Sequence, residues 1–227
     1  GKMKKTAKFI QFLTYWPIYL TLKFFVHYKV EGQENLAGLE DKGVIFASNH
    51  ASYADGPISA ASMPRSGFYP GKFFPIRFLA FRTYFNWFNP IPFPLGIFAA
   101  LYVRVNGSVP VEKAKGDLLK ALRHVIGEMK NGAKLWIYPE GSITKDGKLQ
   151  NGKRGVTFLH QQTGAPIVPV ALIGTFKILS LKTLLRKNKV IVRIGKPIYS
   201  LENCTKDSCN LEGGVEKVMS EIARLMQ

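Results

Sequence analysis

The hydrophobic pattern of the chain alternates between short apolar runs and segments in which apolar residues recur every three or four positions. Short apolar runs bounded by turn residues are typical of buried strands, and the three-and-four spacing is typical of amphipathic helices. Strands are expected over residues 26–30, 44–47, 98–105, 135–138, 167–172 and 190–194. Helices are expected over residues 111–130, between Arg154 and Gly164, and over a C-terminal segment that contains Val215, Val218, Ile222 and Leu225.

Two residues mark special positions in this pattern. Gly132 follows the helix expected over residues 111–130, and glycine is a common stop signal just past the end of a helix. Pro169 lies inside the strand expected over residues 167–172. Because the proline nitrogen has no hydrogen to donate, we expect Pro169 at an edge of the sheet or at a bulge.

The N-terminal segment, residues 2–26, begins with lysines and continues as an apolar run rich in Phe, Tyr and Trp. It resembles a signal peptide, but no small-residue cleavage site follows it. A membrane-spanning helix needs about 20 mostly apolar residues, and Gln11, Pro17 and Lys23 interrupt this run. The aromatic residues and lysines favour a helix that lies in the membrane interface or re-enters it, with a spanning helix and a plain packing helix as alternatives.

Composition and charge limit the classes of partner. The chain has 227 residues, of which 46% are hydrophobic, and this argues against disorder. Thirty-two Lys and Arg residues oppose fifteen Asp and Glu residues, which gives a net charge of +17 and points to nucleic acid, anionic lipid or an acidic protein. Residues 64–98 interleave basic and aromatic side chains, which suits lipid contact or core packing ahead of nucleic acid. No helix-turn-helix, zinc-finger or aromatic RNA-binding signature is found.

The cysteines and histidines do not suggest a metal site. Cys204 and Cys209 lie in a polar stretch with no histidine near them in sequence, so we expect reduced thiols, with a local disulfide as the alternative. The four histidines are scattered along the chain without the spacing of metal ligands.

Residues 48–57 carry the clearest chemistry. They follow the strand expected over residues 44–47, and ligands bind at the carboxyl ends of strands in open α/β sheets. His50 can meet Asp55 if His50 lies in the turn and Asp55 in the first turn of the next helix, with Ser52 as the N-cap. Such a pair acts as a general base, because the imidazole accepts a proton from a hydroxyl while the carboxylate fixes its tautomer. Alternatively, Ser52 and Asp55 form a capping box, and Asp55 binds only the backbone. Ser52 is also the nearby alternative nucleophile.

Four blocks then stand in order along the chain. They are Asn49-His50 with Asp55, the segment Tyr102-Val103-Arg104, the turn Tyr138-Pro139-Glu140-Gly141-Ser142, and the strand Ile167-Val168-Pro169-Val170. Together they resemble the four motifs of the glycerolipid acyltransferases, the 1-acylglycerol-3-phosphate acyltransferase family of bacteria, over roughly residues 26–200.

The resemblance implies an α/β domain over residues 27–227, with a mixed, mostly parallel sheet flanked by helices, and a membrane-associated helical motif over residues 1–26. It implies transfer of an acyl group from acyl-carrier protein or coenzyme A to a lysophospholipid hydroxyl at the cytoplasmic face of the membrane. No cofactor, metal or nucleic acid is expected. Acylation of another lysolipid or of glycerol 3-phosphate is the alternative, followed by a non-enzymatic basic protein that binds membrane or nucleic acid.

The resemblance also implies roles for individual residues. His50 would be the general base and Asp55 its partner, Arg104 and the Glu140-Gly141 turn would bind the acceptor headgroup, and Pro169 would shape the site. Lys72 is a second candidate for binding the phosphate. The third motif of the family usually continues Gly-Thr-Arg, whereas Ile143 occupies the arginine position here. Either Lys153 or Arg154 is therefore expected to replace the missing cation, or the acceptor differs from that of the family.

Overall fold

The computed structural model describes residues 2–86, 95–111, 117–178, 180, 185, 188–202 and 210–227. Cys204 and Cys209 lie outside the described residues, as do Trp87, Phe88 and Phe93 of the basic and aromatic segment over residues 64–98.

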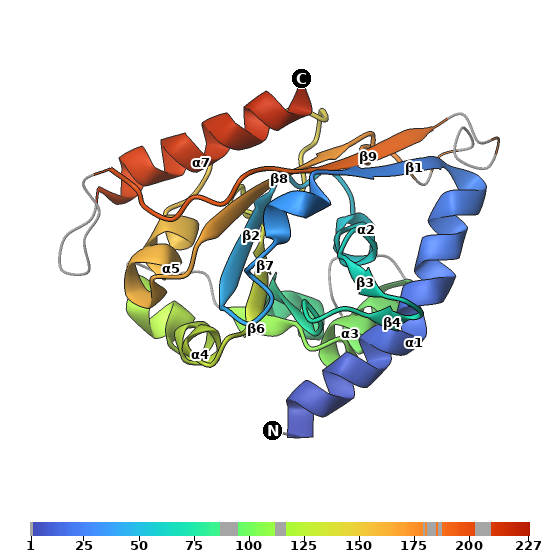
Figure 1. Cartoon of the computed structure of the whole chain (residues 1–227), viewed down its shortest axis with the longest axis horizontal. Helices are drawn as coiled ribbons and strands as arrows, with labels where there is room; N and C mark the ends of the chain where they lie inside the picture. Colours follow the sequence, from blue (N-terminus) through green and yellow to red (C-terminus); the bar gives the residue numbers. More distant parts are fainter. Residues whose placement is uncertain are drawn as a thin grey trace.

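The described part of the chain forms one seven-stranded sheet in the order β1-β9-β8-β2-β7-β5-β6 (Figure 1). Every neighbouring pair is parallel except β8 with β9. The fold class expected from the sequence, α/β with a mixed and mostly parallel sheet, is therefore confirmed. The strands are β1 (His27–Glu31), β2 (Val44–Ser48), β5 (Ile76–Phe81), β6 (Val109–Val111), β7 (Lys134–Ile137), β8 (Ile167–Ile173) and β9 (Lys189–Ile194). A separate two-stranded hairpin pairs β3 (Arg65–Ser66) with β4 (Tyr69–Pro70).

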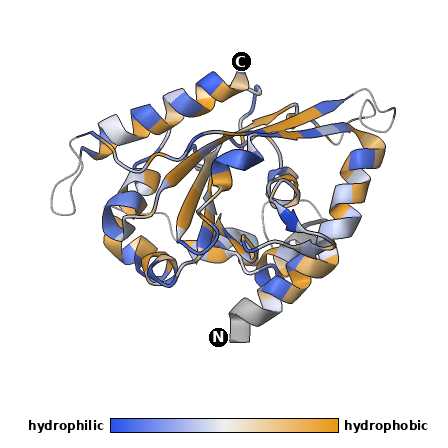
Figure 2. Ribbon diagram, viewed as in Figure 1, coloured by the Kyte–Doolittle hydropathy of each residue, from blue (hydrophilic) through white to orange (hydrophobic). Residues whose placement is uncertain are grey.

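The sheet is covered by helices on both faces. Val44 and Phe46 of β2 belong to a core that also contains residues of α1 (Lys2–Phe25) and α2 (Asp55–Ala61). Ile45 and Ala47 face the second core, which is built with α4 (Leu118–Lys130), α5 (Gly155–Thr163) and α7 (Leu211–Met226). A strand buried on both faces reads as a nearly continuous apolar run, and Figure 2 shows the central strands as mostly hydrophobic ribbons.

Local sequence explains where the helices begin and end. The Asp117 carboxylate accepts a hydrogen bond from the Lys120 amide at the N-terminus of α4, and Gly132 follows this helix with φ 78°, as expected from the stop signal. Gly164 ends α5 with φ 66°. Glycine adopts this left-handed conformation without the steric cost that a Cβ brings. The structure also contains two short 3-10 helices, η1 (Gln33–Leu36) and η2 (Arg82–Phe85).

One expected strand is a helix. Residues 98–105 belong to α3 (Leu95–Val105), so the interpretation of the segment ending in Tyr102-Val103-Arg104 as a strand is wrong. A short apolar run cannot be distinguished from a buried helix by periodicity alone. The two alanines at positions 99 and 100 favour the helix, because alanine has the highest helix propensity.

Pro169 lies in an interior strand, where its missing N–H is accommodated by a bulge. Val170 pairs with Ile194 of β9, and Ile167 pairs with Ile198. Two residues separate the partners on β8 and three separate those on the β9 side, so one extra residue lies opposite Pro169. The expected bulge is thus confirmed, and the Pro169 carbonyl still accepts from the amide of Gly195 at 2.8 Å.

The helix α1 packs its inner face against the domain. Gln11, 3% exposed, donates to the carbonyls of Ile76 and Asn106 and accepts from the Ile76 amide. The polar residue that interrupts the apolar run is therefore a hydrogen-bonded anchor between α1 and β5. Among the described residues, no helix has both the length and the hydropathy required to cross a bilayer.

The outer face of α1 is apolar and exposed. Phe9, Leu13, Leu20 and Phe24 are 58%, 51%, 58% and 63% exposed. At about 100° per residue they fall within roughly 60° of one another on the helix. We call these four residues the outer stripe.

Candidate functional site

The sheet places His50 immediately after the carboxyl end of β2, in the loop that leads into α2. His50 Nδ1 lies 2.8 Å from Asp55 Oδ2, and the His50 side chain is 19% exposed while that of Asp55 is fully buried. A carboxylate only accepts, so Nδ1 carries the hydrogen in the neutral ring and Nε2 is left as the proton acceptor. The geometry that the sequence motif predicted for the two side chains is present.

Asp55 also organises the loop itself. Its Oδ2 atom accepts from the amides of Ala51 at 2.6 Å and Ser52 at 2.8 Å, in addition to the His50 ring. The backbone-binding and histidine-binding roles considered from the sequence are thus combined in one oxygen. Ser52 is not the N-cap of α2, because that position belongs to Ala54 and no side chain caps it. The Ser52 hydroxyl instead accepts from the Ala54 amide.

A tyrosine that sequence reasoning missed completes the surroundings of the imidazole. The ring of Tyr138 stacks on that of His50 with centroids 3.9 Å apart and planes 12° apart. Burial, followed by the charge of Asp55, raises the pKa of Tyr138 well above its usual value, so the phenol is neutral. Tyr138 follows β7, the neighbour of β2 in the sheet, and the register pairs Ala47 with Ile137. The sequence feature that could have identified Tyr138 is its position between the end of an apolar strand and Pro139.

Glu140 ties the site loops together. Its carboxylate accepts from the His50 amide at 2.7 Å and from the Gln150 amide at 2.9 Å, and the residue is 3% exposed. Burial raises the pKa of this carboxyl group, while the two backbone donors act in the opposite direction. With both oxygens bound to backbone amides, Glu140 holds the loop that carries His50 rather than facing an acceptor phosphate.

A lysine lies over the neighbouring turn. Gly141 has φ 72°, and a Cβ built on it would come within 2.5 Å of Lys153 Nζ. The Gly141 amide is already donated to the Tyr138 carbonyl. The structure therefore brings an exposed ammonium group to the third motif, next to the residues that hold His50. Arg154 extends elsewhere, and its Nη1 atom lies 3.9 Å from Glu212 of α7.

Arg104 is connected to the site indirectly, through α3 and η2. Its Nη2 atom donates to the carbonyl of Phe85, the last residue of η2. Tyr84 of η2 is hydrogen-bonded to Tyr53 in the loop after His50. Tyr102 of α3, whose pKa burial raises to about 12, is close enough to Tyr138 to raise the pKa of that residue. Arg104 thus belongs to an element that contacts the site.

Lys72 is not brought to this site. It pairs with Asp41 at 3.0 Å, and both side chains are exposed. Asp41 precedes β2, whereas His50 follows it, so the two groups lie at opposite ends of the strand. A five-residue strand separates its ends by about 15 Å. Pro169 of β8 pairs with Ala47 of β2, which places it in the strand next to the His50 loop.

The arrangement is suited to removing a proton from a substrate that also carries an anionic group. A buried carboxylate and a stacked ring orient the imidazole, and a cation lies beside the adjoining turn. A hydroxyl that is deprotonated here becomes a nucleophile towards an activated carbonyl. Among the described residues, no group of three or more His, Cys, Asp or Glu side chains is placed to hold a metal ion.

Comparison with known proteins gives consistent results. A family model described as Acyltransferase matches residues 27–173. A curated 1-acyl-sn-glycerol-3-phosphate acyltransferase of Saccharomyces cerevisiae is 35% identical over 187 residues, which are 79% of this chain and 54% of that protein. A chloroplastic enzyme of the same description from Brassica napus is 28% identical over 80% of this chain and 48% of its own length. The chain therefore spans about half the length of these curated relatives.

A solved structure has the same fold. The crystal structure of the 1-acyl-sn-glycerophosphate acyltransferase PlsC from Thermotoga maritima matches with a TM-score of 0.59. The match covers 99% of this chain and 78% of the other at 24% identity.

Proposed function

The chain belongs to the Acyltransferase family, and from this premise we propose that it transfers a fatty acyl group from an acyl thioester to the free hydroxyl of 1-acylglycerol 3-phosphate, giving phosphatidic acid. The named activity of the curated relatives supports the choice of substrate. The observation that carries the proposed chemistry is the 2.8 Å contact between His50 Nδ1 and Asp55 Oδ2 at the end of β2.

The proposed reaction needs one base and no covalent enzyme intermediate. His50 Nε2 accepts the proton of the acceptor hydroxyl, and the oxygen attacks the thioester carbonyl. The tetrahedral intermediate collapses, the carbon–sulfur bond breaks, and the imidazolium returns its proton to the leaving thiolate. Asp55 holds the tautomer and stabilises the transient imidazolium. The donor is acyl-carrier protein or coenzyme A carrying the acyl chain.

The direct test compares variants of the base pair. The His50→Ala protein should lose acyl transfer while its thermal unfolding stays cooperative. The Asp55→Asn protein should lose about three to four orders of magnitude in kcat, as in other base–orienter pairs. Substantial turnover by a folded His50→Ala protein would exclude this mechanism. Incubation with thioester alone should leave the protein unmodified in mass spectrometry, whereas a stoichiometric adduct on Ser52 would indicate a ping-pong mechanism instead.

A second candidate acceptor follows from Ile143. Because Ile143 replaces the usual arginine of the third motif and cannot donate, the phosphate site relies on Lys153 and Arg104 in our proposal. Another lysolipid or glycerol 3-phosphate is the alternative acceptor. Assays of the purified protein against lysophosphatidate, other lysophospholipids and glycerol 3-phosphate, each with both donor types, distinguish these acceptors by kcat/KM.

We also propose that the outer stripe of α1 docks the protein on the cytoplasmic face of the membrane. Exposed apolar side chains along one helix face are typical of helices that lie in the interface. Because α1 contributes Tyr15 and Leu22 to the core, deleting the helix would disturb the fold, and surface substitutions are the better test. Replacing the outer stripe by serines should weaken binding to phosphatidylcholine vesicles more than high salt does.

A further inference from the structure

A polar pocket lies away from His50, where α1 packs against β1 and the start of the β3–β4 hairpin. Its volume is about 620 Å³, within the range of small-ligand sites. The residues that define its character are Tyr15, Tyr19, Lys23, Tyr28, Lys29 and Arg65. None of the residues that surround His50 lines it, so this pocket is separate from the catalytic site.

Arg65 is held over an aromatic platform. Its guanidinium carbon lies 4.8 Å from the ring centroid of Trp16 and 4.7 Å from that of Tyr19. Within the described ranges, no carboxylate lies at ion-pair distance from Arg65. The guanidinium group carries its N–H donors in one plane, and such a planar fork can bind two oxygens of a phosphate at once.

The other charges at the pocket leave it positive. Lys23 Nζ donates to the Tyr28 carbonyl at 3.1 Å. Because this partner is uncharged, the positive charge of Lys23 is not neutralised by it. Lys29 is neutralised by Glu31 at 2.7 Å, and hydrogen bonds from Lys29 and Arg193 lower the pKa of Glu31. Burial raises the pKa of Tyr15 to about 12 and that of Tyr28 well above its ordinary value, so both phenols are neutral. Lys23 and Arg65 together give a site for an anion.

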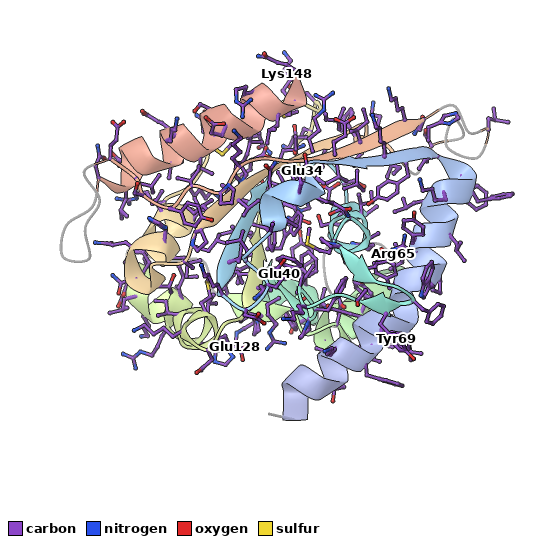
Figure 3. The ribbon with its side chains drawn as sticks, viewed as in Figure 1. Glu34, Glu40, Arg65, Tyr69, Glu128 and Lys148 are labelled. Atoms are coloured by element: carbon purple, nitrogen blue, oxygen red, sulfur yellow. The ribbon has the colours of Figure 1, made fainter. Side chains whose placement is uncertain are left out.

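An aromatic rim joins this pocket to the outer stripe. Phe68 and Tyr69, at the turn of the β3–β4 hairpin, are 61% and 66% exposed. Phe68 stacks on Trp16 with centroids 5.1 Å apart, and Tyr69 stacks on Phe12 at 5.6 Å. Figure 3 shows Arg65 and Tyr69 beside α1. Tryptophan and tyrosine concentrate at the headgroup level of membranes, so this rim suits the depth at which lipid phosphates lie.

We propose that the pocket of Lys23 and Arg65 binds the phosphate of an anionic bilayer lipid, while Phe68 and Tyr69 enter the interface beside it. The proposal rests on the membrane docking of α1 proposed above. It adds a headgroup site that selects anionic bilayers and is distinct from the acceptor site at His50. The occupant is a phosphate that is presented at a membrane surface.

The test measures cosedimentation with vesicles of phosphatidylcholine alone and of phosphatidylcholine with one-fifth phosphatidylglycerol. Arg65→Gln and Lys23→Gln should each weaken binding to the mixed vesicles about fivefold or more and leave binding to neutral vesicles unchanged. The matched control is Arg123→Gln, which removes the same charge from an exposed position on α4, a helix on the opposite face of the sheet. Thermal unfolding of each variant reports its fold.

Three outcomes decide the matter. A selective loss in the Arg65 and Lys23 variants supports the site, and equal losses in all three variants overturn it in favour of net charge. Displacement of the wild-type protein from mixed vesicles by millimolar inorganic phosphate at constant ionic strength would overturn the choice of a bilayer lipid in favour of free phosphate.

Acyl transfer to detergent-dispersed lysophosphatidate should persist in the Arg65→Gln protein, so its loss of vesicle binding is distinguishable from failure of the proposed chemistry. Failure of α1 docking is distinguished by the outer-stripe variant, which should lose binding to neutral vesicles.

Discussion

The ring of Tyr138 lies nearly parallel to the imidazole of His50, with the two centroids 3.9 Å apart. Asp55 fixes one edge of the imidazole and Tyr138 covers one of its faces, so the ring is restrained in two independent directions. Since burial keeps the phenol neutral, Tyr138 is an uncharged wall rather than a competing acid or base. We assign it a positioning role, which a hydroxyl-free aromatic ring should also fulfil.

Substitution of Tyr138 tests this role. Tyr138→Phe should retain most of kcat, because it keeps the ring that stacks on His50 and removes only a buried hydroxyl. Tyr138→Leu should lower kcat about twofold to tenfold, in line with about 0.5–1.5 kcal/mol for an aromatic pair, while KM for the acceptor stays nearly constant. Steady-state kinetics with both substrates provides the measurement. A Tyr138→Leu enzyme with unchanged kcat would show that stacking is incidental.

The two cations proposed for the third motif should behave differently. Lys153 lies over Gly141, whereas Arg154 is directed towards Glu212. Losing a charge-assisted contact costs about 1.5–3 kcal/mol, which is roughly tenfold to 150-fold in affinity. Lys153→Ala should therefore raise KM for lysophosphatidate by tenfold or more, and the neighbouring Arg154→Ala should change it less than threefold. Equal effects, or a Lys153 effect that persists with an uncharged acceptor, would remove Lys153 from the phosphate site.

The pH dependence of stability should carry the signature of Glu140. Burial raises the pKa of its carboxyl group above the usual 4.5, so the folded state holds this proton to higher pH than the unfolded state does. The stabilisation is complete below the unfolded-state pKa and is lost as the pH rises through the folded-state pKa. The unfolding free energy of the wild type minus that of Glu140→Gln should therefore fall as the pH increases from 4 to 7. Denaturant titrations at several pH values measure this quantity, and a rise with pH would contradict the expected sign.

Gln11 should be essential for the attachment of α1. Gln11→Leu leaves the Ile76 amide and the carbonyls of Ile76 and Asn106 without their partner. Each buried polar group left unsatisfied costs about 1–3 kcal/mol, so we expect a loss of about 3 kcal/mol or more in urea unfolding. Thr21→Ala, which removes an exposed hydrogen bond to Pro17 on the same helix, should change stability by less than about 0.5 kcal/mol. Similar losses in both variants would show that the hydrogen bonds of Gln11 are not specifically responsible for attaching α1.

The sequence predicted most of the central strands and the amphipathic helices. The central strands β2, β7 and β8 are mostly apolar and α4 has a clear amphipathic pattern, so these elements were predicted. The start of the helix expected at residue 111 was wrong, because Val111 lies in β6 and α4 begins at Leu118. The helix α3 was predicted as a strand because its apolar residues carry no periodicity that separates the two structures. The His50–Asp55 contact was predictable because both partners lie within one turn of chain.

Contacts between distant segments were the part that sequence could not give. Tyr138 reaches His50 only because β7 pairs with β2 in one register, and a register between strands 90 residues apart is set by the whole core. Lys72 was expected at the site from the family resemblance, but it lies at the other end of β2 beside Asp41. Lys153 was one of two alternatives, and the side-chain directions, which distinguish it from Arg154, follow from tertiary packing.

Asn49, which follows β2 directly, joins the loop of His50 to the neighbouring strand β8. Its carboxamide accepts from the Leu172 amide at 2.7 Å and donates to the Leu172 carbonyl at 2.9 Å, as a peptide group of a paired strand would. The exchange of the Leu172 amide with solvent therefore requires the loop, rather than the sheet, to open. The rate of hydrogen–deuterium exchange at the Leu172 amide therefore reports how often the His50 loop opens. A bound ligand that holds the loop closed should slow this exchange.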